Sequence, residues 1–362
     1  MSNTSATALP SEPSRLGELL RGRGRNLGLL VALVGWVVVV SSQNEHFFTI
    51  SNARVIGMNM SIVAIAAVGT AILIVTGNID LSIGSNLAFA AILSAKFSTM
   101  MPVWLGFVAA ILISGLIGLF NGVMCWNVPI SPIVITLGTL ALLRGIVYVT
   151  TDGQPVTNTD AHFTDFGRAI VSGVPMPIIV MVVVAVLSAI VLGTTTIGRH
   201  CYAVGGNKQA AQAAGIRVRR VTIGAFVYGG LLAGLAGVIA ASRFDAPDPT
   251  YGTGFELEVI TGVLLGGVSF AGGEGGVIGA LLGVLALTLI DAGLVALGVD
   301  PFYSDVVQGG LLILAVSFDQ IAHVQRERYQ KLMAMREQAR MLEERRAASS
   351  GAATEAGQPR PP

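Results

Sequence analysis

Four acidic residues lie within or beside strongly apolar stretches of this 362-residue chain: Asp80, Glu256, Glu258 and Asp291. An ionised carboxylate is costly in contact with lipid, so such residues face the protein interior and often mark a transport pathway. Asp80 could contact a transported solute, or it could cap the following helix or act at a hinge. Asp291 could line a pore or hydrogen-bond to a neighbouring helix.

Neutral polar side chains and one arginine occur in the same apolar surroundings. Amides and hydroxyls suit an uncharged sugar or polyol better than an ion. The predicted substrate pathway comprises Asp80, Ser82, Asn121, Thr136, Arg144, Glu256, Asp291 and Gln308.

No motif for catalysis or metal binding is present in the sequence. The chain has no G-x-x-x-x-G-K-[ST] phosphate loop, no H-E-x-x-H and no G-x-S-x-G, so we predict no catalytic residues and no ATP hydrolysis by that route. Cys125, Cys201 and four scattered histidines form no zinc, redox or disulfide pattern. We therefore expect no metal and no cofactor.

The composition indicates an integral membrane protein. Hydrophobic residues make up 53% of the chain and charged residues only 12%, against about 25% charge in soluble domains. A membrane-spanning helix needs about 20 mostly apolar residues. Ten segments approach this length: 26–42, 56–76, 82–100, 103–125, 132–150, 175–193, 220–242, 255–270, 275–297 and 302–318. We predict an all-α polytopic bundle of about ten transmembrane helices, which the lipid bilayer surrounds.

Some of these helices are expected to be broken, because the polar stretches at 77–84 and 271–275 are very brief. Each stretch is either a short loop or a re-entrant break. Segment 26–42 follows several arginines and is either a signal peptide or a retained first helix. An even number of spans requires the retained helix.

Orientation follows from the distribution of Lys and Arg. Most of the 22 lie before residue 26, in the loop 194–220, or after Phe318. An even number of spans places all three regions on one side, which the positive-inside rule identifies as the cytoplasm. The net charge of +1 gives no argument for a nucleic-acid partner. The opposite loops, 43–55, 151–174 and 243–254, are short, so a partner there must be a separate protein.

Three regions follow from this topology. Residues 1–25 form a predicted disordered cytoplasmic tail, and residues 26–318 form the transmembrane domain with the cytoplasmic loop 194–220. Residues 319–362 form a charged cytoplasmic helix followed by a disordered tail. This helix could be simply solvated, form a short coiled coil, or lie on lipid headgroups.

The loop 194–220 contains a predicted short helix. Asn207 is a suitable N-terminal cap, and Gly215 ends the helical stretch. Such a helix between two membrane spans could dock onto another subunit, or it could be an ordinary surface loop. Within the spans, glycines spaced by four, such as Gly118 with Gly122 and Gly230 with Gly234, predict close helix packing.

Four separated motifs resemble a known family. They are residues 76–84 (TGNIDLSIG), 132–139 (PIVITLGT) followed by Arg144, 198–216, and 252–257 (GTGFEL) continuing to 273. Together they resemble the permease subunits of bacterial ABC importers for ribose, xylose, galactose and autoinducer, over roughly residues 30–318. Glu274, Asp291 and the long charged tail depart from the family pattern.

The resemblance implies an ATP-driven importer that moves a sugar or related polyol across the bacterial inner membrane by alternating access. Two permease copies would form the pore, with an ABC ATPase on another chain and a periplasmic or extracellular substrate-binding protein as partners. It also implies a coupling element that contacts the ATPase, comprising Gly198, Arg199, Asn207, Ala210, Ala211, Gly215 and Ile216.

Two other functions remain open on the sequence. A related ABC permease for branched-chain amino acids or nucleosides has the same general build. An ion-coupled secondary transporter would need intramembrane ion sites, for which Asp80 and Asp291 are the candidates.

Overall fold

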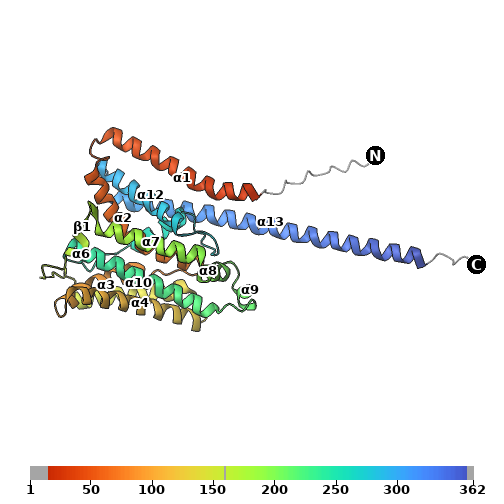
Figure 1. Ribbon diagram of the computed structural model, residues 1–362, viewed down its shortest axis with the longest axis horizontal. Coiled ribbons are helices and arrows are strands. Elements are labelled where there is room, and N and C mark those ends of the chain that lie inside the picture. The colour runs from red at the N-terminus through yellow and green to blue at the C-terminus, as the bar shows by residue number, and fades with distance from the viewer. Residues whose placement is uncertain (1–14, 159, 357–362) are drawn as a thin grey trace, which may run out of the picture. The chain divides into compact units, whose positions relative to one another are not determined.

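The computed structural model describes residues 15–158 and 160–356, and these residues are mostly helical (Figure 1). The chain divides into a helical bundle that ends at Ala315 and a second unit that starts at Val316. The second unit contains the later part of one long helix, α13 (Phe302–Ala356). The first 14 residues of the predicted N-terminal tail lie outside the described residues, and α1 begins at Arg15 rather than near residue 26.

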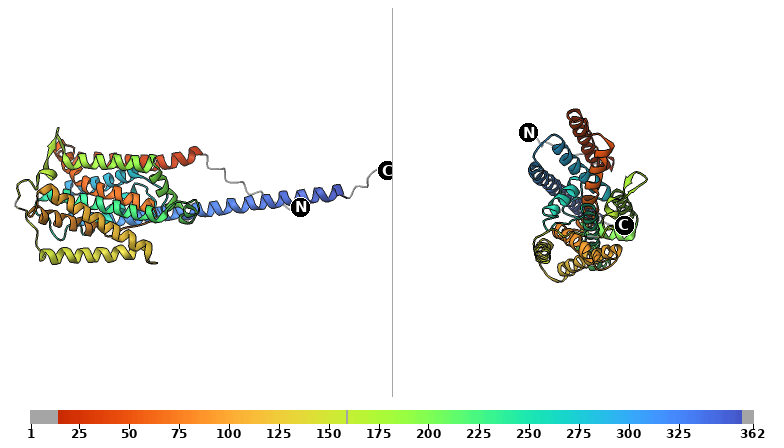
Figure 2. Two further views of the ribbon diagram at one scale, coloured as in Figure 1. Left: turned by 60° about the horizontal axis from the view of Figure 1, so that its bottom comes forward. Right: turned by 90° about the vertical axis from the view of Figure 1, so that its left-hand side faces the viewer.

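The bundle is built from helices and one small hairpin. In chain order the elements before α13 are α1 (Arg15–Gln43), α2 (Ile50–Val75), α3 (Ile83–Ser98), α4 (Val103–Asn127), α5 (Pro132–Thr151), α6 (Asp165–Arg168), β1 (Ile170–Val171), β2 (Val174–Pro175), α7 (Met176–Thr194), α8 (Thr196–Gly206), α9 (Lys208–Ala213), α10 (Val218–Phe244), α11 (Phe255–Leu265) and α12 (Val277–Ala296). The axes of the long helices in the bundle lie roughly parallel to one another, as the left view of Figure 2 shows.

Seven of the described helices are long and apolar enough to cross a membrane. They are α2, α4, α5, α7, α10, α12 and the first part of α13, Phe302–Ala322. The predicted segments 26–42 and 82–100 correspond to the shorter apolar stretches Leu27–Gln43 and Ile83–Ser98. Segment 255–270 is interrupted, because α11 ends at Leu265 and Gly267 takes a φ of +88°. The mostly helical architecture with several candidate membrane spans is confirmed. The count of about ten spans and the orientation of the termini stay predictions.

Two helices, α2 and α10, form the centre of the bundle. Every residue of α2 from Ser61 to Val75 is buried, as expected for a helix that is apolar on all faces. The α10 helix packs against α2, α3 and α4. By contrast, α4, α5 and α7 have few buried residues and each present exposed apolar side chains. These outer faces are available to lipid or to another membrane protein.

Small residues allow α4 and α10 to approach closely. A Cβ atom added to Gly230 would lie 2.5 Å from the Ser114 carbonyl oxygen, and one on Gly118 would overlap the Phe226 carbonyl. A Cβ on Gly122 would lie 3.0 Å from the Ile223 Cα. The predicted packing role of the Gly118/Gly122 and Gly230/Gly234 pairs is therefore confirmed, and the two pairs belong to one interface.

A tryptophan attaches α1 to α12. The Trp36 Nε1 donates a hydrogen bond to the Leu289 carbonyl at 2.9 Å. The indole occupies the space over Gly293, where an added Cβ would lie 2.5 Å from the ring nitrogen. About two helical turns further on, the Asn44 Nδ2 donates to the Ala296 carbonyl at 2.8 Å.

Candidate functional site

A buried polar network surrounds Asp80, in the break between α2 and α3. The Asp80 Oδ1 accepts hydrogen bonds from the Ser82 backbone N at 2.8 Å and from the Ser82 Oγ at 2.6 Å. Only 4% of Asp80 is exposed. The carboxylate therefore fixes the turn that leads into α3, although the N-cap position itself is taken by Ser82, whose side chain makes no capping bond.

The network continues from the break into α4 and α5. The Asn121 Nδ2 donates to the Ser82 Oγ at 2.9 Å and lies 3.4 Å from the Asp80 Oδ2. Thr139 Oγ1 then donates to the Asn121 Oδ1 at 2.6 Å. Asp80, Ser82 and Asn121, which are 41 residues apart at most, thus meet in one network, and their place in a substrate pathway stays a prediction.

Thr139 completes this network and was not among the predicted residues. The predicted Thr136 lies one helical turn earlier on α5, and its hydroxyl bonds only to carbonyls of its own helix, those of Pro132 and Ile133. The i to i+3 spacing of Thr136 and Thr139 puts both on one helix face. From that spacing, Thr139 could have been predicted from the sequence together with Thr136.

Arg144 secures the loop that precedes α11. Its Nη1 donates to the carbonyl oxygens of Pro249 at 2.9 Å and Tyr251 at 2.8 Å. The guanidinium also lies close enough to attract the Glu256 carboxylate. The Glu256 Oε2 is buried beside Gly84 and has no hydrogen-bond partner among the described residues.

A cavity of about 310 Å³ lies between α2, α11 and the start of α13. Its polar walls come from Asn59, Glu258, Asp305 and Gln308, and aromatic side chains cover other parts. Of the predicted pathway residues only Gln308 lines this cavity. Asp305, three residues earlier on the same helix face, was not predicted, although its spacing from Gln308 was visible in the sequence.

Asp291 lies on α12 and does not line the cavity. Its carboxylate is near Ser304 at the start of α13 and near enough to repel Glu258. Its two predicted roles, lining a pore or bonding to a neighbouring helix, both stay predictions. The predicted pathway residues thus do not form one site. Asp80, Ser82 and Asn121 share a network, Arg144 and Glu256 lie by the loop before α11, and Gln308 lines the cavity.

The loop between α7 and α10 folds into two short helices at one end of the bundle. The Thr195 Oγ1 accepts from the Gly198 N at the start of α8, and the Asn207 Oδ1 accepts from the Ala210 N at 2.9 Å at the start of α9. Gly215 ends the second helix with a φ of +81°. The expected short helix, its asparagine cap and its terminal glycine are all present.

One face of α9 packs inward and the other is open. Ala211 is buried against Val204 and Val218, with Trp126 at the edge of this small core. The Lys208 Nζ lies 5.0 Å from the centre of the Trp126 ring, within the range of a cation–π interaction. Ala210, Ala213 and Ala214 are exposed together with the neighbouring glutamines.

Of the remaining predicted coupling residues, Gly198 lies against the Leu192 carbonyl and Arg199 Nη1 donates to the Thr194 carbonyl at 3.3 Å. The Ile216 N donates to the Ala211 carbonyl at 3.0 Å.

Glycines join α8 to both breaks in the membrane helices. A Cβ on Gly205 would overlap the Val75 carbonyl at the end of α2 and would lie 2.6 Å from the Gly273 N. A Cβ on Gly272 would lie 2.9 Å from the Gly77 Cα. The Tyr202 hydroxyl donates to the Gly275 carbonyl, and the Gly273 N donates to the Val75 carbonyl. We call this three-way contact of residues 75–77, 205–206 and 272–275 the glycine joint.

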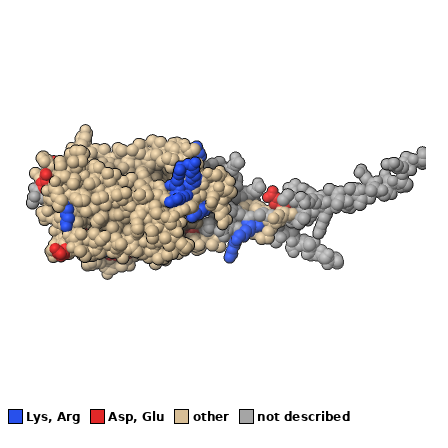
Figure 3. All heavy atoms as spheres, turned by 90° about the horizontal axis from the view of Figure 1, so that it is seen from below, with Lys and Arg blue, Asp and Glu red and all other residues tan. Residues whose placement is uncertain are grey.

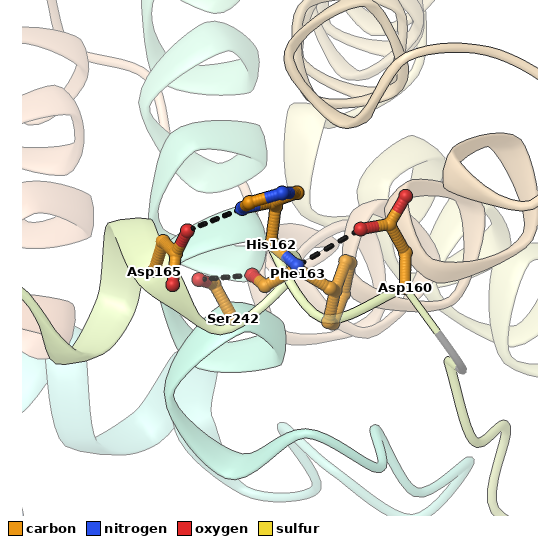
Figure 4. A network of polar contacts seen from close by, with 5 residues as sticks. All are labelled: Asp160, His162, Phe163, Asp165 and Ser242. Carbon is orange, nitrogen blue, oxygen red and sulfur yellow. Dashed lines mark hydrogen bonds and ion pairs between the residues drawn. The ribbon is translucent and has the colours of Figure 1, made fainter.

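Side chains hold the loop between α5 and β1 on the opposite end of the bundle (Figure 4). Phe163 is fully buried, with its ring centre 5.5 Å from that of Phe107. The Ser242 Oγ donates to the Phe163 carbonyl at 2.7 Å and accepts from the Gly167 N. On the outer surface the His162 Nδ1 lies 2.9 Å from the Asp165 Oδ2, and this carboxylate raises the pKa of His162.

The two ends also differ in charge. In the face shown in Figure 3, Lys and Arg side chains gather near α8 and α9, whereas acidic side chains appear at the other end. The short hairpin β1–β2 is at that other end, with Ile170 paired to Pro175 and positive φ values at Ser172 and Gly173 in its turn. Among the described residues, no group of His, Cys, Asp and Glu is arranged to hold a metal ion.

Comparison with known proteins agrees with a transmembrane bundle. A family model described as the branched-chain amino acid transport system / permease component matches residues 55–316. The chain belongs to this permease family. It is a multi-pass protein of the bacterial inner membrane, as its apolar helices and this family indicate.

Several characterised permeases are similar along most of their length. The ribose import permease protein of Escherichia coli K12 is 38% identical over 299 residues, which cover 80% of this permease and 92% of that protein. The D-allose transport system permease protein of the same strain is 35% identical, over 82% and 90% of the two chains. The L-arabinose ABC transporter permease protein of Azospirillum brasilense is 34% identical, over 83% and 88%. The resemblance found in the sequence is therefore confirmed, and the whole of α1 lies before the matched family region.

Proposed function

We propose that this permease is the pore subunit of an ATP-driven importer for a sugar or related polyol. The relatives named for ribose, allose and arabinose support the class of substrate. The observation that carries the mechanism is the attachment of α8 and α9 to the helix breaks through the glycine joint. ATP hydrolysis belongs to a separate subunit, because the chain has no phosphate-binding loop.

In this proposal α9 is the element that the ATPase contacts. Its exposed face carries small side chains, Ala210, Ala213 and Ala214, which fit into a cleft without steric obstruction. Its inner face is fixed by Ala211 and by the Lys208–Trp126 contact. A displacement of α9 and α8 would therefore reach the end of α2 and the loop before α12.

The orientation follows the positive-inside rule. The α8–α9 end, with its gathered Lys and Arg side chains, faces the cytoplasm together with the N-terminal tail 1–25 and the charged region 319–362, and residues 26–318 form the membrane domain. The opposite end, with the loop anchored by Phe163, faces a separate substrate-binding protein. The exposed apolar faces of α4, α5 and α7 contact the bilayer or, in a homodimer, the second permease.

The solute would pass near the predicted pathway residues. The network of Asp80, Ser82 and Asn121 holds the α2–α3 break in shape, and the cavity with Glu258 and Gln308 offers hydrogen-bonding groups to a solute. The family description leaves a branched-chain amino acid as a second candidate substrate. Competition for uptake between unlabelled D-ribose and unlabelled L-leucine separates the two.

The decisive experiment is purification of the tagged permease from native membranes in mild detergent, with partners identified by mass spectrometry. We expect an ATPase with a phosphate loop in about equal amount. Ala210→Arg, on the open face of α9, should lose this partner, whereas Gln154→Arg, exposed at the opposite end, should retain it. Uptake by the permease alone in liposomes without ATP would overturn the proposal in favour of ion coupling.

A further inference from the structure

The cavity between α2, α11 and α13 has an uneven distribution of charge. Glu258 and Asp305 contribute carboxylates to its wall, and none of the described lining residues is Lys or Arg. Two guanidinium groups lie near the cavity but are not part of its lining, and the Arg243 Nη1 is buried without a hydrogen-bond partner among the described residues. Arg144 donates to loop carbonyls, and Arg243 lies over the Phe244 ring with its Cζ 4.9 Å from the ring centre. The lining itself therefore carries two carboxyl groups and no basic side chain.

Glu258 is the residue that points to a ligand. Its side chain is mostly buried on α11 and lines the cavity, yet it accepts no hydrogen bond from any residue that the structure describes. Its charged neighbours, Asp291 and Asp305, repel it. Its carboxylate oxygens are open to the cavity rather than sealed within the protein. A hydroxyl or ammonium donor that enters the cavity can therefore hydrogen-bond to them without competition from a protein donor.

The rest of the lining suits a small polyhydroxylated molecule. Asn59 and Gln308 offer amides that both donate and accept, while Tyr251 and Phe255 offer apolar ring surface. The volume of about 310 Å³ is at the small end of the range for small-molecule sites, roughly 300–1,000 Å³. An anion would meet the same two carboxyl groups at close range, and no described lining residue supplies a cation.

We propose that this cavity is a solute-binding site and that Glu258 and Asp305 make it a charge filter. The filter accepts neutral sugars and polyols and cationic amino sugars, and it rejects sugar acids and sugar phosphates. The inference rests on the proposed transport function for its biological meaning, but the charge of the cavity can be measured without transport.

The test introduces a thiol into the cavity as Gln308→Cys, in a background where Cys125 and Cys201 are replaced by serine and alanine. The purified full-length protein is treated with two methanethiosulfonate reagents of similar size, one bearing a trimethylammonium and one a sulfonate. We expect the cationic reagent to react at least about tenfold faster than the anionic one, relative to a small free thiol, because opposite charges at close range interact by more than RT in a partly buried site.

Two further variants of the permease serve as controls for this measurement. Adding Glu258→Gln and Asp305→Asn should bring the rate ratio down toward that of the free thiol. Gln154→Cys, exposed at one end of the bundle, should give a ratio much nearer to the free thiol. Equal rates at Gln308→Cys, a ratio unaffected by neutralising the two acids, or no reaction with either reagent would each overturn the filter.

A separate arm addresses the solute. Uptake of labelled D-ribose by cells that contain the whole transporter is challenged with D-glucosamine and with D-glucuronate, and Glu258→Gln/Asp305→Asn cells are compared with wild type. We expect competition by glucosamine only, and measurable competition by glucuronate after neutralisation. Glucuronate competition in the wild type would overturn the filter. Absence of any ribose uptake with the thiol rate ratio intact would overturn the proposed sugar import and leave the charged cavity standing.

Discussion

The two ends of the bundle are held together in different ways. At the end with α8 and α9, the contacts join backbone to backbone, because Gly205, Gly272 and Gly273 bring three segments together with no side chain between them. At the other end, side chains hold the segments together. Phe163 inserts its ring into the bundle, and Ser242 and Arg168 fix the chain around it.

This difference implies different mechanical behaviour. A contact between backbones has no rotamer that can absorb a shift, so a movement of α8 passes directly to α2 and to the loop before α12. A buried aromatic ring instead resists displacement, because pulling it out exposes its apolar surface. We therefore expect the glycine joint to move as one piece during transport and the Phe163 anchor to stay in place.

The largest effect is expected from Phe163→Ala. Deleting a fully buried ring typically costs about 3–5 kcal/mol, so the thermal unfolding temperature of the purified protein should fall clearly. Phe166→Ala is the matched control, since Phe166 is only half-buried beside the same rings, and its loss should be smaller. Equal stability losses would contradict the anchor role of Phe163.

A smaller loss of stability but a large loss of uptake is expected from Gly205→Ala. The new methyl group would overlap the Val75 carbonyl, and overpacking of this kind typically costs about 1–3 kcal/mol. Uptake of the labelled substrate should fall severely because the joint is forced apart. Gly206→Ala meets no atom within 4 Å and should transport normally. Normal uptake by Gly205→Ala would show that the joint does not transmit movement.

A smaller loss of stability is expected from mutations in the hydrogen-bond network around Asp80. Thr139→Val removes the donor to Asn121 Oδ1, which typically costs about 1 kcal/mol. Thr136→Val, whose hydroxyl bonds only within its own helix, should cost less. Thermal unfolding of the two variants side by side measures the difference, and a reversed order would mean that the network does not stabilise the α2–α3 break.

The smallest effect concerns the exposed pair His162 and Asp165. Because Asp165 raises the pKa of His162, the pair favours the folded loop at pH values below the ordinary histidine pKa, and this contribution is lost as the pH rises through the raised value. Asp165→Asn should move the pKa down toward its ordinary value in an NMR titration of the histidine rings. An unchanged pKa would show that the pair does not form in solution.

The sequence predicted features that depend on local rules. The glycine pairs in α4 and α10, the Asn207 cap and the Gly215 helix end follow from residue type and spacing within a few positions. The apolar runs likewise predicted the membrane helices. The exception is segment 255–270, which was predicted as one helix although α11 ends at Leu265, just before a run of glycines.

Features that depend on the approach of distant segments were not accessible in this way. The sequence shows both Glu256 and Glu258, but two residues along a helix turn by about 200°, and only the packed structure shows that Glu258 lines the cavity. Similarly, Asp305 lines the cavity only because α13 packs near α11. Gly205 matters only because α8 lies against the end of α2, which is far away along the chain.

The position of Trp126 under the Lys208 ammonium gives the permease an optical signal of its own. The chain has three tryptophans, and the other two lie apart from this contact, with Trp36 against α12 and Trp104 exposed at the opposite end of α4. With those two replaced by phenylalanine, one indole would remain, and a nearby ammonium alters its emission. Binding of a partner to α9 would then appear as a change in fluorescence, in real time and without an attached dye.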